Sequence, residues 1–364
     1  MKPYDHFTAS SEFFPEEIKR EKSPCDGCFA SCCWIAGLQK MEPENFFQLD
    51  FAYYLAGFRH IEIGINRKGI WNVNLRRPCS HLDEAYECRL HENGRKPQVC
   101  KEYDEGNCLY REAFLGNGAN YYLRLDRRRM EILLGKTALS ESGSVIETPA
   151  REALEVEFEK IKEYDFDEGM TPFRKGSFGD FGGGRGGNFF EMSENPCLNC
   201  PAPCCQLLAF NYGFPDGFSN ADFMRYLAGF EGIEFAISDR GYMIIVWTAC
   251  AHFESESRNC SLHQTARKPN VCRYYNAHDC WYKRNFLTQD TADILILKRE
   301  ETGEILNHFE YDKNGKILYQ PRMAQVAAIL SELRGARVKE ISSDIEKRFI
   351  GAGLTRGFPG KNNL

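Results

Sequence analysis

CDGCFASCC, residues 25–33, recurs as CLNCPAPCC at residues 197–205, which shows that the chain contains an internal repeat. Four more cysteines follow each copy in matching order, so the sixteen cysteines of the 364-residue chain form two groups of eight. The first group is Cys25, Cys28, Cys32, Cys33, Cys79, Cys88, Cys100 and Cys108; the second is Cys197, Cys200, Cys204, Cys205, Cys250, Cys260, Cys272 and Cys280. In seven of the eight pairs the spacing is 172 residues. A repeated framework of soft sulfur ligands predicts metal binding.

The repeat extends beyond the cysteines. YLAGF occurs at residues 54–58 and again at 226–230, and the β-rich run IEIGI at 61–65 matches IEFAI at 233–237. Each copy ends on an expected helix that begins at a proline, Pro149 or Pro321. The sequence therefore predicts an α+β fold of two tandem, pseudo-symmetric, small cysteine-rich domains, each with short helices and antiparallel strands around a metal centre.

The expected domain boundaries follow from composition. Residues 1–165 form the first cysteine-cluster domain and residues 197–350 the second. Between them, residues 166–196 are rich in glycine, which suits neither a helix nor a strand interior, so we expect a linker. Residues 351–364 are predicted to form a flexible C-terminal tail.

Charge and hydropathy exclude several classes of protein. The formal net charge of −6 argues against a general nucleic-acid binder, which is normally basic. The first residues, MKPYDHFTAS, lack the apolar core of a secretory signal, and no apolar run approaches the roughly 18 residues of a membrane span. We expect a cytoplasmic protein whose partner is an unknown protein or a small molecule.

The compartment bears on the cysteines. In a reducing cytosol they remain thiols and serve as metal ligands or redox groups, whereas in a secreted chain they would pair as disulfides. The disulfide alternative predicts neither metal nor free thiols.

The spacing of the cysteines suggests how they are used. Cys25-x2-Cys28 and its counterpart at 197–200 suit two ligands on one ion across a tight turn. Adjacent side chains diverge, so each Cys-Cys pair either divides between two sites or contributes one ligand. Lys-Pro-x-Val-Cys, at residues 96–100 and 268–272, predicts a helix that begins at the proline. Cys25, Cys28, Cys32, Cys100 and their counterparts are the leading ligand candidates.

Basic and histidine side chains accompany these cysteines. Arg89, Arg95, Lys96 and Lys101 lie near the first group, and Arg267, Lys268 and Arg273 lie near the second. They either compensate the charge of metal-bound thiolates or simply face solvent. His81, His91, His252 and His263 also recur in pairs, and for them a structural role is favoured over ligation or proton transfer.

CDGCFASCC and CLNCPAPCC, followed in both copies by C-x-H, C-x-L-H and R-K-P-x-V-C, resemble the YkgJ-type cysteine-cluster family, the CxxCxxCC putative zinc- or iron-chelating domain. The resemblance covers residues 25–108 and 197–280. It implies a metal site holding iron–sulfur or zinc, and the family includes flagellin lysine N-methylases. This chain has three residues, where the family name has two, before the Cys-Cys pair.

Three hypotheses follow. The first is a metal-chelating protein with at least one site per repeat and a redox or cluster-assisted role, in which an iron–sulfur cluster is preferred to zinc. The second is a protein-modifying enzyme, such as a lysine N-methylase, which would bind S-adenosylmethionine. The third is a zinc-stapled interaction module without catalysis, which would unfold when a chelator removes the zinc. The sequence leaves open whether the protein is an enzyme.

Overall fold

The computed structural model describes residues 30–66, 68–83, 87–90, 96–102, 123–161, 200–254, 257, 259–287 and 293–335. We call residues 30–161 the first half and residues 200–335 the second half. The expected linker, residues 166–196, and tail, residues 351–364, lie outside the described residues, as do Cys25, Cys28, Cys108 and Cys197. Helices and strands both occur, so the α+β class is confirmed.

The first half is built on a four-stranded antiparallel sheet. Its elements are η3 (Ser31–Cys33), β1 (Ile35–Met41), α1 (Phe46–Leu55), β2 (Ile61–Ile65), β3 (Trp71–Arg76), α2 (Gln98–Lys101), β4 (Leu123–Leu125), α4 (Arg127–Lys136), β5 (Ala138–Leu139), β6 (Val145–Glu147) and α5 (Arg151–Glu159). The strand order is β1-β3-β2-β4.

The second half has a sheet of the same order, β7-β9-β8-β12. Its elements are η5 (Pro203–Cys205), β7 (Leu207–Gly213), α6 (Phe218–Ala228), β8 (Ile233–Ser238), β9 (Gly241–Trp247), β10 (Phe253–Glu254), β11 (Asn259–Cys260), α7 (Asn270–Arg273), α8 (Trp281–Phe286), β12 (Leu295–Leu297), α9 (Arg299–Asn307), β13 (Glu310–Tyr311), β14 (Ile317–Tyr319) and a helix over residues 323–335. We call residues 172 apart, or 171 apart in β3 and β9, counterparts.

Alternation along the strands sets one face of each sheet toward a common core. In β2 the side chains of Ile61 and Ile63 are buried there, and in β8 those of Ile233, Phe235 and Ile237. This is the period of two expected of a strand. The buried apolar residues of both halves form one contiguous cluster, so the halves share a core.

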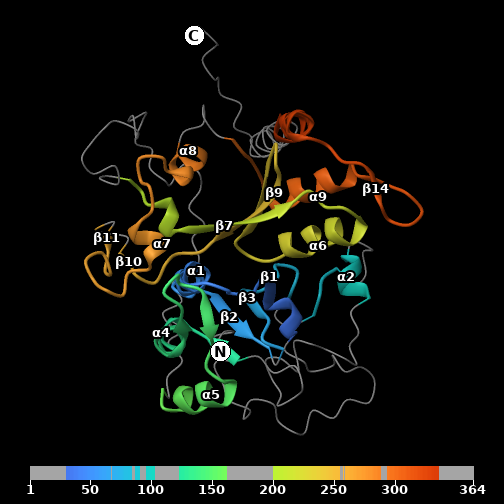
Figure 1. The fold of residues 1–364 in the computed structure, drawn as a ribbon. Coiled ribbons are helices and arrows are strands. Elements are labelled where there is room, and N and C mark those ends of the chain that lie inside the picture. Colours follow the sequence, from blue (N-terminus) through green and yellow to red (C-terminus); the bar gives the residue numbers. More distant parts are fainter. Residues whose placement is uncertain are drawn as a thin grey trace, which may run out of the picture.

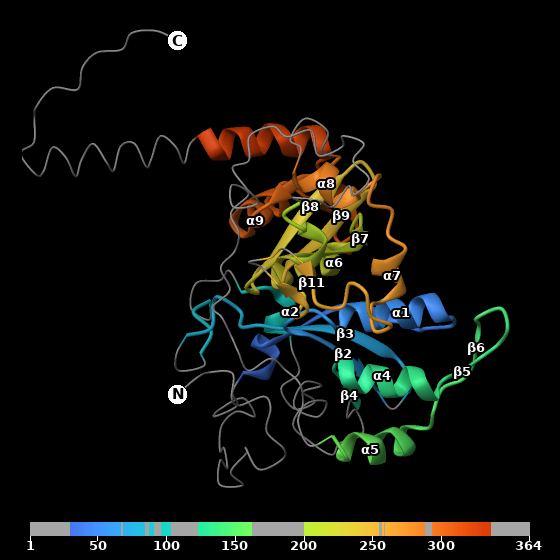
Figure 2. The ribbon, with the colours of Figure 1, turned by 90° about the vertical axis from the view of Figure 1, so that its left-hand side faces the viewer.

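The two halves are joined crosswise. Helix α7 of the second half lies beside α1 of the first, and α2 of the first half lies beside α6 of the second (Figure 1). Figure 2 shows the same arrangement from the side, with α4 and α5 on the far side of the first sheet from the second half. Two isolated antiparallel bridges also cross the interface, Phe58 with Cys250 and Cys79 with Phe230.

Several local predictions are confirmed. The strands at residues 61–65 and 233–237 are present, and short helices follow Pro97 and Pro269. Helix α5 begins two residues after Pro149. Strand β11 ends at Cys260, because the chain turns at residues 261–264.

Candidate thiol sites

The backbone attaches the fifth cysteine of each group to the Cys-Cys pair. The Cys79 N–H donates to the carbonyl oxygen of Cys33 (2.6 Å), and the Cys250 N–H donates to that of Cys205 (2.8 Å). Each Cys-Cys pair ends a short 3-10 helix that leads into an edge strand, β1 or β7. Segments some 45 residues apart along the chain are thereby brought together in each half.

The sixth cysteine of each group lies on a small hairpin that begins shortly after the fifth. Cys88 pairs with Leu82 in an isolated bridge, and Cys260 pairs with Phe253 in the β10–β11 ladder. The Arg89 N–H donates to the carbonyl oxygen of His81 at 2.9 Å, which closes the first hairpin next to Cys79.

The seventh cysteine lies on a short helix that the opposite half holds. Cys272 is on α7, whose Asn270 and Val271 N–H groups donate to the carboxylate of Asp50 at 2.9 and 2.8 Å. Cys100 is on α2, whose Val99 N–H donates to Asp222 at 2.9 Å. Asp50 and Asp222 are counterparts on α1 and α6, and both are buried.

Four thiols of the first half share one electrostatic neighbourhood. Burial raises the pKa of Cys79, and Cys88 and Cys32 raise it further. Burial likewise raises the pKa of Cys100 to about 12, with additional effects of Cys32, Cys79 and Cys88. Cys79 and Cys100 therefore sense the charges of the other thiols, because groups of like charge disfavour each other's ionisation. We call Cys32, Cys79, Cys88 and Cys100 the first thiol set.

The counterparts of these four residues behave in the same way. Burial raises the pKa of Cys250, and Cys260 and Cys204 raise it further. Burial raises the pKa of Cys272 to about 12, followed by the effects of Cys250, Cys204 and Cys260. We call Cys204, Cys250, Cys260 and Cys272 the second thiol set.

Adjacent cysteines are linked through their side chains. A hydrogen bond with Cys32, then burial, and then the charges of Cys32, Cys79 and Cys100 raise the pKa of Cys33, so Cys33 borders the first thiol set. A hydrogen bond with Cys205, and then burial, raises the pKa of Cys204. How each pair divides its ligands stays a prediction.

Cys280 occupies a different position. Its sulfur accepts from the Lys283 N–H at 3.4 Å, at the start of α8, and from the Tyr275 hydroxyl at 3.5 Å. Cys200 is buried ahead of η5. Cys25, Cys28, Cys108 and Cys197 lie outside the described residues.

Positive charges reach each thiol set from two directions. Within the halves, Lys96 lowers the pKa of Cys100 and Lys268 lowers that of Cys272, each against the larger effect of burial. Lys283, which is 1% exposed, acts on Cys204 in the same sense.

The other cations come from the opposite half. Against the rise that burial causes, Arg299 of the second half lowers the pKa of Cys79, and Arg127 of the first half lowers that of Cys250. Arg299 donates to the Ser80 hydroxyl, and Arg127 donates to the carbonyl oxygen of Arg267 at 2.8 Å. Both arginines begin a helix, α4 or α9.

The histidines next to the thiols act through their backbone. Backbone hydrogen bonds from His81 and His252 oppose the rise in pKa that burial causes at Cys79 and Cys250. Nδ1 of His252 lies 3.3 Å from the Ser261 hydroxyl, and Nδ1 of His263 lies 3.2 Å from Lys268 Nζ. His91 lies outside the described residues.

Sequence reasoning missed the residues that act across the interface. They are the counterpart pairs Asp50 and Asp222, Tyr54 and Tyr226, and Arg127 and Arg299. Both tyrosines belong to the repeated YLAGF, and every pair keeps the spacing of 172. That signal marks the residues, but it does not reveal that their partners lie in the other copy.

Among the described residues, no group of three or more His, Cys, Asp or Glu side chains has the geometry to hold a metal ion.

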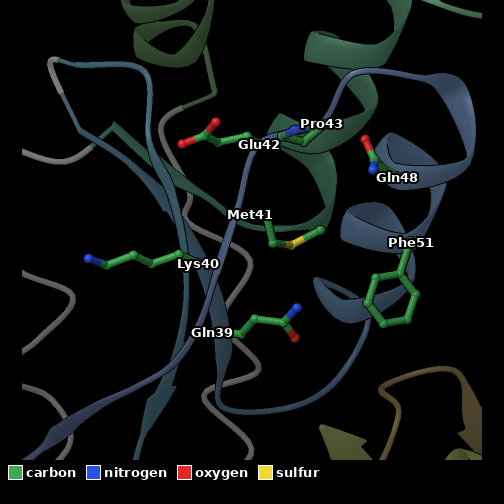
Figure 3. Close-up of a pocket in the computed structure, with 7 residues that line it drawn as sticks. All are labelled: Gln39, Lys40, Met41, Glu42, Pro43, Gln48 and Phe51. Atoms are coloured by element: carbon green, nitrogen blue, oxygen red, sulfur yellow. The ribbon is translucent and has the colours of Figure 1, made fainter. Parts of the chain in front are cut away.

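A hollow of about 270 Å³ lies away from the thiols, between the end of β1 and α1, at the other end of β1 from Cys32 and Cys33. Figure 3 shows Met41 extending toward α1 and Lys40 pointing away from it.

Comparison of the chain with protein-family models, curated proteins and solved structures found no match. Of the helices in the described ranges, none combines the length and the apolar character that crossing a membrane requires.

Proposed function

We propose that the protein is a metal-chelating protein of two duplicated, pseudo-symmetric domains, with one thiolate-held metal centre in each half. One observation carries the proposal: the same backbone contacts recur in both halves, where the fifth cysteine bonds to the Cys-Cys pair and the seventh lies on a short helix that bonds to an aspartate of the opposite half. Two sets of counterparts brought together by the same backbone contacts are difficult to explain by packing alone.

The chemistry of the donors fits a metal. The twelve cysteines in the described residues are free thiols. Neighbouring thiols disfavour each other's ionisation. A bound cation reverses this effect, because it stabilises the thiolates and the thiol protons are released when it binds. Backbone hydrogen bonds to Cys79 and Cys250, together with nearby lysines and arginines, are the kind of support that metal-bound thiolates require.

Metal binding would require a local change in the structure. Because the described side chains form no group of three or more with metal-binding geometry, the sulfur atoms of a set must approach one another when metal binds. The short hairpins and four-residue helices that carry Cys88, Cys260, Cys100 and Cys272 are the elements that would adjust.

We prefer an iron–sulfur cluster to zinc. The surroundings of Cys204 favour it, because Tyr54 and Tyr282 are both half-buried beside this thiol and would help to shield a cluster from water. When bound, a cluster supplies electron transfer or assists a reaction. Membership of the YkgJ-type family belongs to the same proposal, and a lysine N-methylase activity rests on that resemblance alone.

A zinc staple is the second candidate. It is favoured by the contacts between each thiol set and the opposite half, since a structural metal would strengthen this interface. It predicts colourless protein, whereas a cluster predicts a brown one.

The test exploits the adjacent pair in the second half. Protein purified without oxygen should lose the metal of one half on Cys204→Ser or Cys272→Ser substitution. Cys205→Ser is the matched control, because Cys205 is the neighbour of Cys204 and is not part of the second thiol set. Iron, zinc and acid-labile sulfide per chain are the quantities to measure. Equal loss in Cys204→Ser and Cys205→Ser, or loss in neither, would contradict the assignment of the set.

A further inference from the structure

Each thiol set is in contact with the opposite half through a buried aspartate. Asp50 and Asp222 are each 5% exposed, and a buried carboxylate requires hydrogen-bond donors. Their donors are backbone N–H groups directly before a cysteine: Asn270 and Val271 precede Cys272, and Val99 precedes Cys100. An aspartate of the other half therefore sets the position of each short helix that carries a cysteine, α2 or α7.

A second pair of contacts crosses in the same direction. The Tyr54 hydroxyl donates to the carbonyl oxygen of Cys204 at 3.3 Å, and the Tyr226 hydroxyl donates to that of Cys32 at 3.0 Å. Tyr54 lies on the same helix as Asp50, and Tyr226 on the same helix as Asp222. Helix α1 thus bonds to Cys204 and to the residues before Cys272, and α6 bonds to Cys32 and to the residue before Cys100.

The backbone bridges complete this pattern. Phe58 pairs with Cys250, and Phe230 pairs with Cys79. Three of the four cysteines in each set consequently touch the opposite half through a hydrogen bond or a bridge, either directly or through the preceding residue.

We propose that Asp50 and Asp222 are positioning residues that act across the interface, so that each half holds the metal-binding thiols of the other. The proposal rests on the proposed function, because it concerns affinity for metal. It implies that the two centres form only when the halves are docked.

The experiment uses full-length chains that keep one set at a time. Cys250→Ser with Cys272→Ser leaves the first set, and Cys79→Ser with Cys100→Ser leaves the second. Zn²⁺ affinity is measured without oxygen by competition with a chromophoric chelator. With the first set alone, Asp222→Asn should weaken Zn²⁺ binding roughly 10–100-fold, the usual effect of losing a residue that orients a ligand. With the second set alone, Asp50→Asn should do the same.

Asp312→Asn is the matched control. Asp312 also accepts two backbone N–H groups, from Asn314 and Lys316 at 2.8 and 2.9 Å, but it does so within the β13–β14 hairpin. It should leave Zn²⁺ affinity unchanged in both chains. Thermal unfolding of every variant reports whether the fold persists.

If an aspartate variant does not fold, Tyr226→Phe and Tyr54→Phe test the same crossing with a smaller change. Weakening of the set in the same half as the substituted residue, or equal affinity in all folded variants, would overturn the inference while metal binding itself stands. Failure of both one-set chains and of the unsubstituted chain to bind Zn²⁺ or iron would overturn the proposed function as well.

Discussion

The two sheets present similar faces to the shared core and different faces away from it. In the first half the outward side chains of the central strands include Glu62, Asn74 and Arg76. Their counterparts are Glu234, Ile245 and Trp247, and Ile245 and Trp247 belong to a separate apolar cluster that α8 covers with Phe286. The inner faces of the two sheets are thus similar in chemistry, whereas the outer faces differ at two of these three positions.

The difference teaches where the repeat is constrained. The inner face of each sheet packs against the opposite half and against the segments that carry the thiols, so two sets of contacts constrain its residues. The outer face is constrained only by the elements that cover it within its own half. Three comparisons between counterparts and one pH dependence test this view, and all are measured as the free energy of unfolding in urea.

The largest expected effect is at Glu62, which is fully buried. It pairs with Arg76 at 3.3 Å and with Arg124 at 2.6 Å. Glu62→Gln should cost about 3–5 kcal/mol, because it removes one partner of a buried ion pair and leaves the arginine charges uncompensated. Glu234→Gln should cost about 1 kcal/mol, because the Trp247 indole N–H, now 2.7 Å from the carboxylate, can donate to an amide oxygen instead. Equal costs would contradict the comparison.

An exchange at the centre of the outer faces is expected to be asymmetric. Ile245→Asn should cost roughly 3 kcal/mol, because it removes a fully buried apolar side chain and buries an amide. Asn74→Leu should be neutral or stabilise the fold by up to about 1 kcal/mol, since within the described residues the Asn74 Nδ2 atom is buried without a hydrogen-bond partner. A substantial loss of stability in Asn74→Leu would show that this amide has a role on the outer face.

The third comparison concerns a tight turn that enters β2 and β8. His60 and Gly232 are counterparts, and both have positive φ, 63° and 79°. Gly232→Ala should cost about 1–3 kcal/mol, because the new Cβ would collide with Arg77 of the first half and lie 3.1 Å from the Trp247 carbonyl oxygen. His60→Gly should cost much less, since glycine adopts this conformation without strain. The reverse ranking would show that a Cβ at position 232 does not collide with Arg77.

The smallest expected effect is a dependence on pH. Burial, and then the charges of Arg77, Arg59 and Arg76, lower the pKa of His60 from 6.5 to about 3. Between these values the unfolded chain binds the proton more readily, so this contribution to stability is lost as the pH falls below 6.5. Between pH 7 and pH 5.5 the loss should be about 1 kcal/mol. The His60→Gly variant should lack this loss of stability. If the free energy of unfolding changed equally with pH in the variant and in the unsubstituted protein, the assignment to His60 would be contradicted.

Much of the local structure could be predicted from the sequence. The β-rich runs IEIGI and IEFAI predicted β2 and β8, and Pro97 and Pro269 predicted α2 and α7. These features depend on nearby residues, which a single sequence displays directly. The repeat of 172 residues also predicted which elements of the two halves would correspond.

The crosswise contacts could not be predicted in this way. The spacing pairs Asp50 with Asp222, yet it does not show that Asp50 holds α7 while Asp222 holds α2. Hydrogen bonds between residues more than 120 positions apart leave no periodic trace in the chain. For the same reason the sequence named the basic residues next to the cysteines, Lys96 and Lys268 among them, but did not identify Arg127 and Arg299 as cations supplied by the other half.

The most direct test of the central claim is the metal content of the unsubstituted protein, purified without oxygen, together with its visible spectrum. We predict one metal centre in each half. In an iron–sulfur protein this would give a brown colour, with iron and acid-labile sulfide amounting to two clusters per chain. Colourless protein with zinc at the same stoichiometry would retain the two thiolate centres and replace the cluster by a staple. A chain with no bound metal would contradict the account, and the absence of free thiols in the same sample would show that the cysteines pair as disulfides.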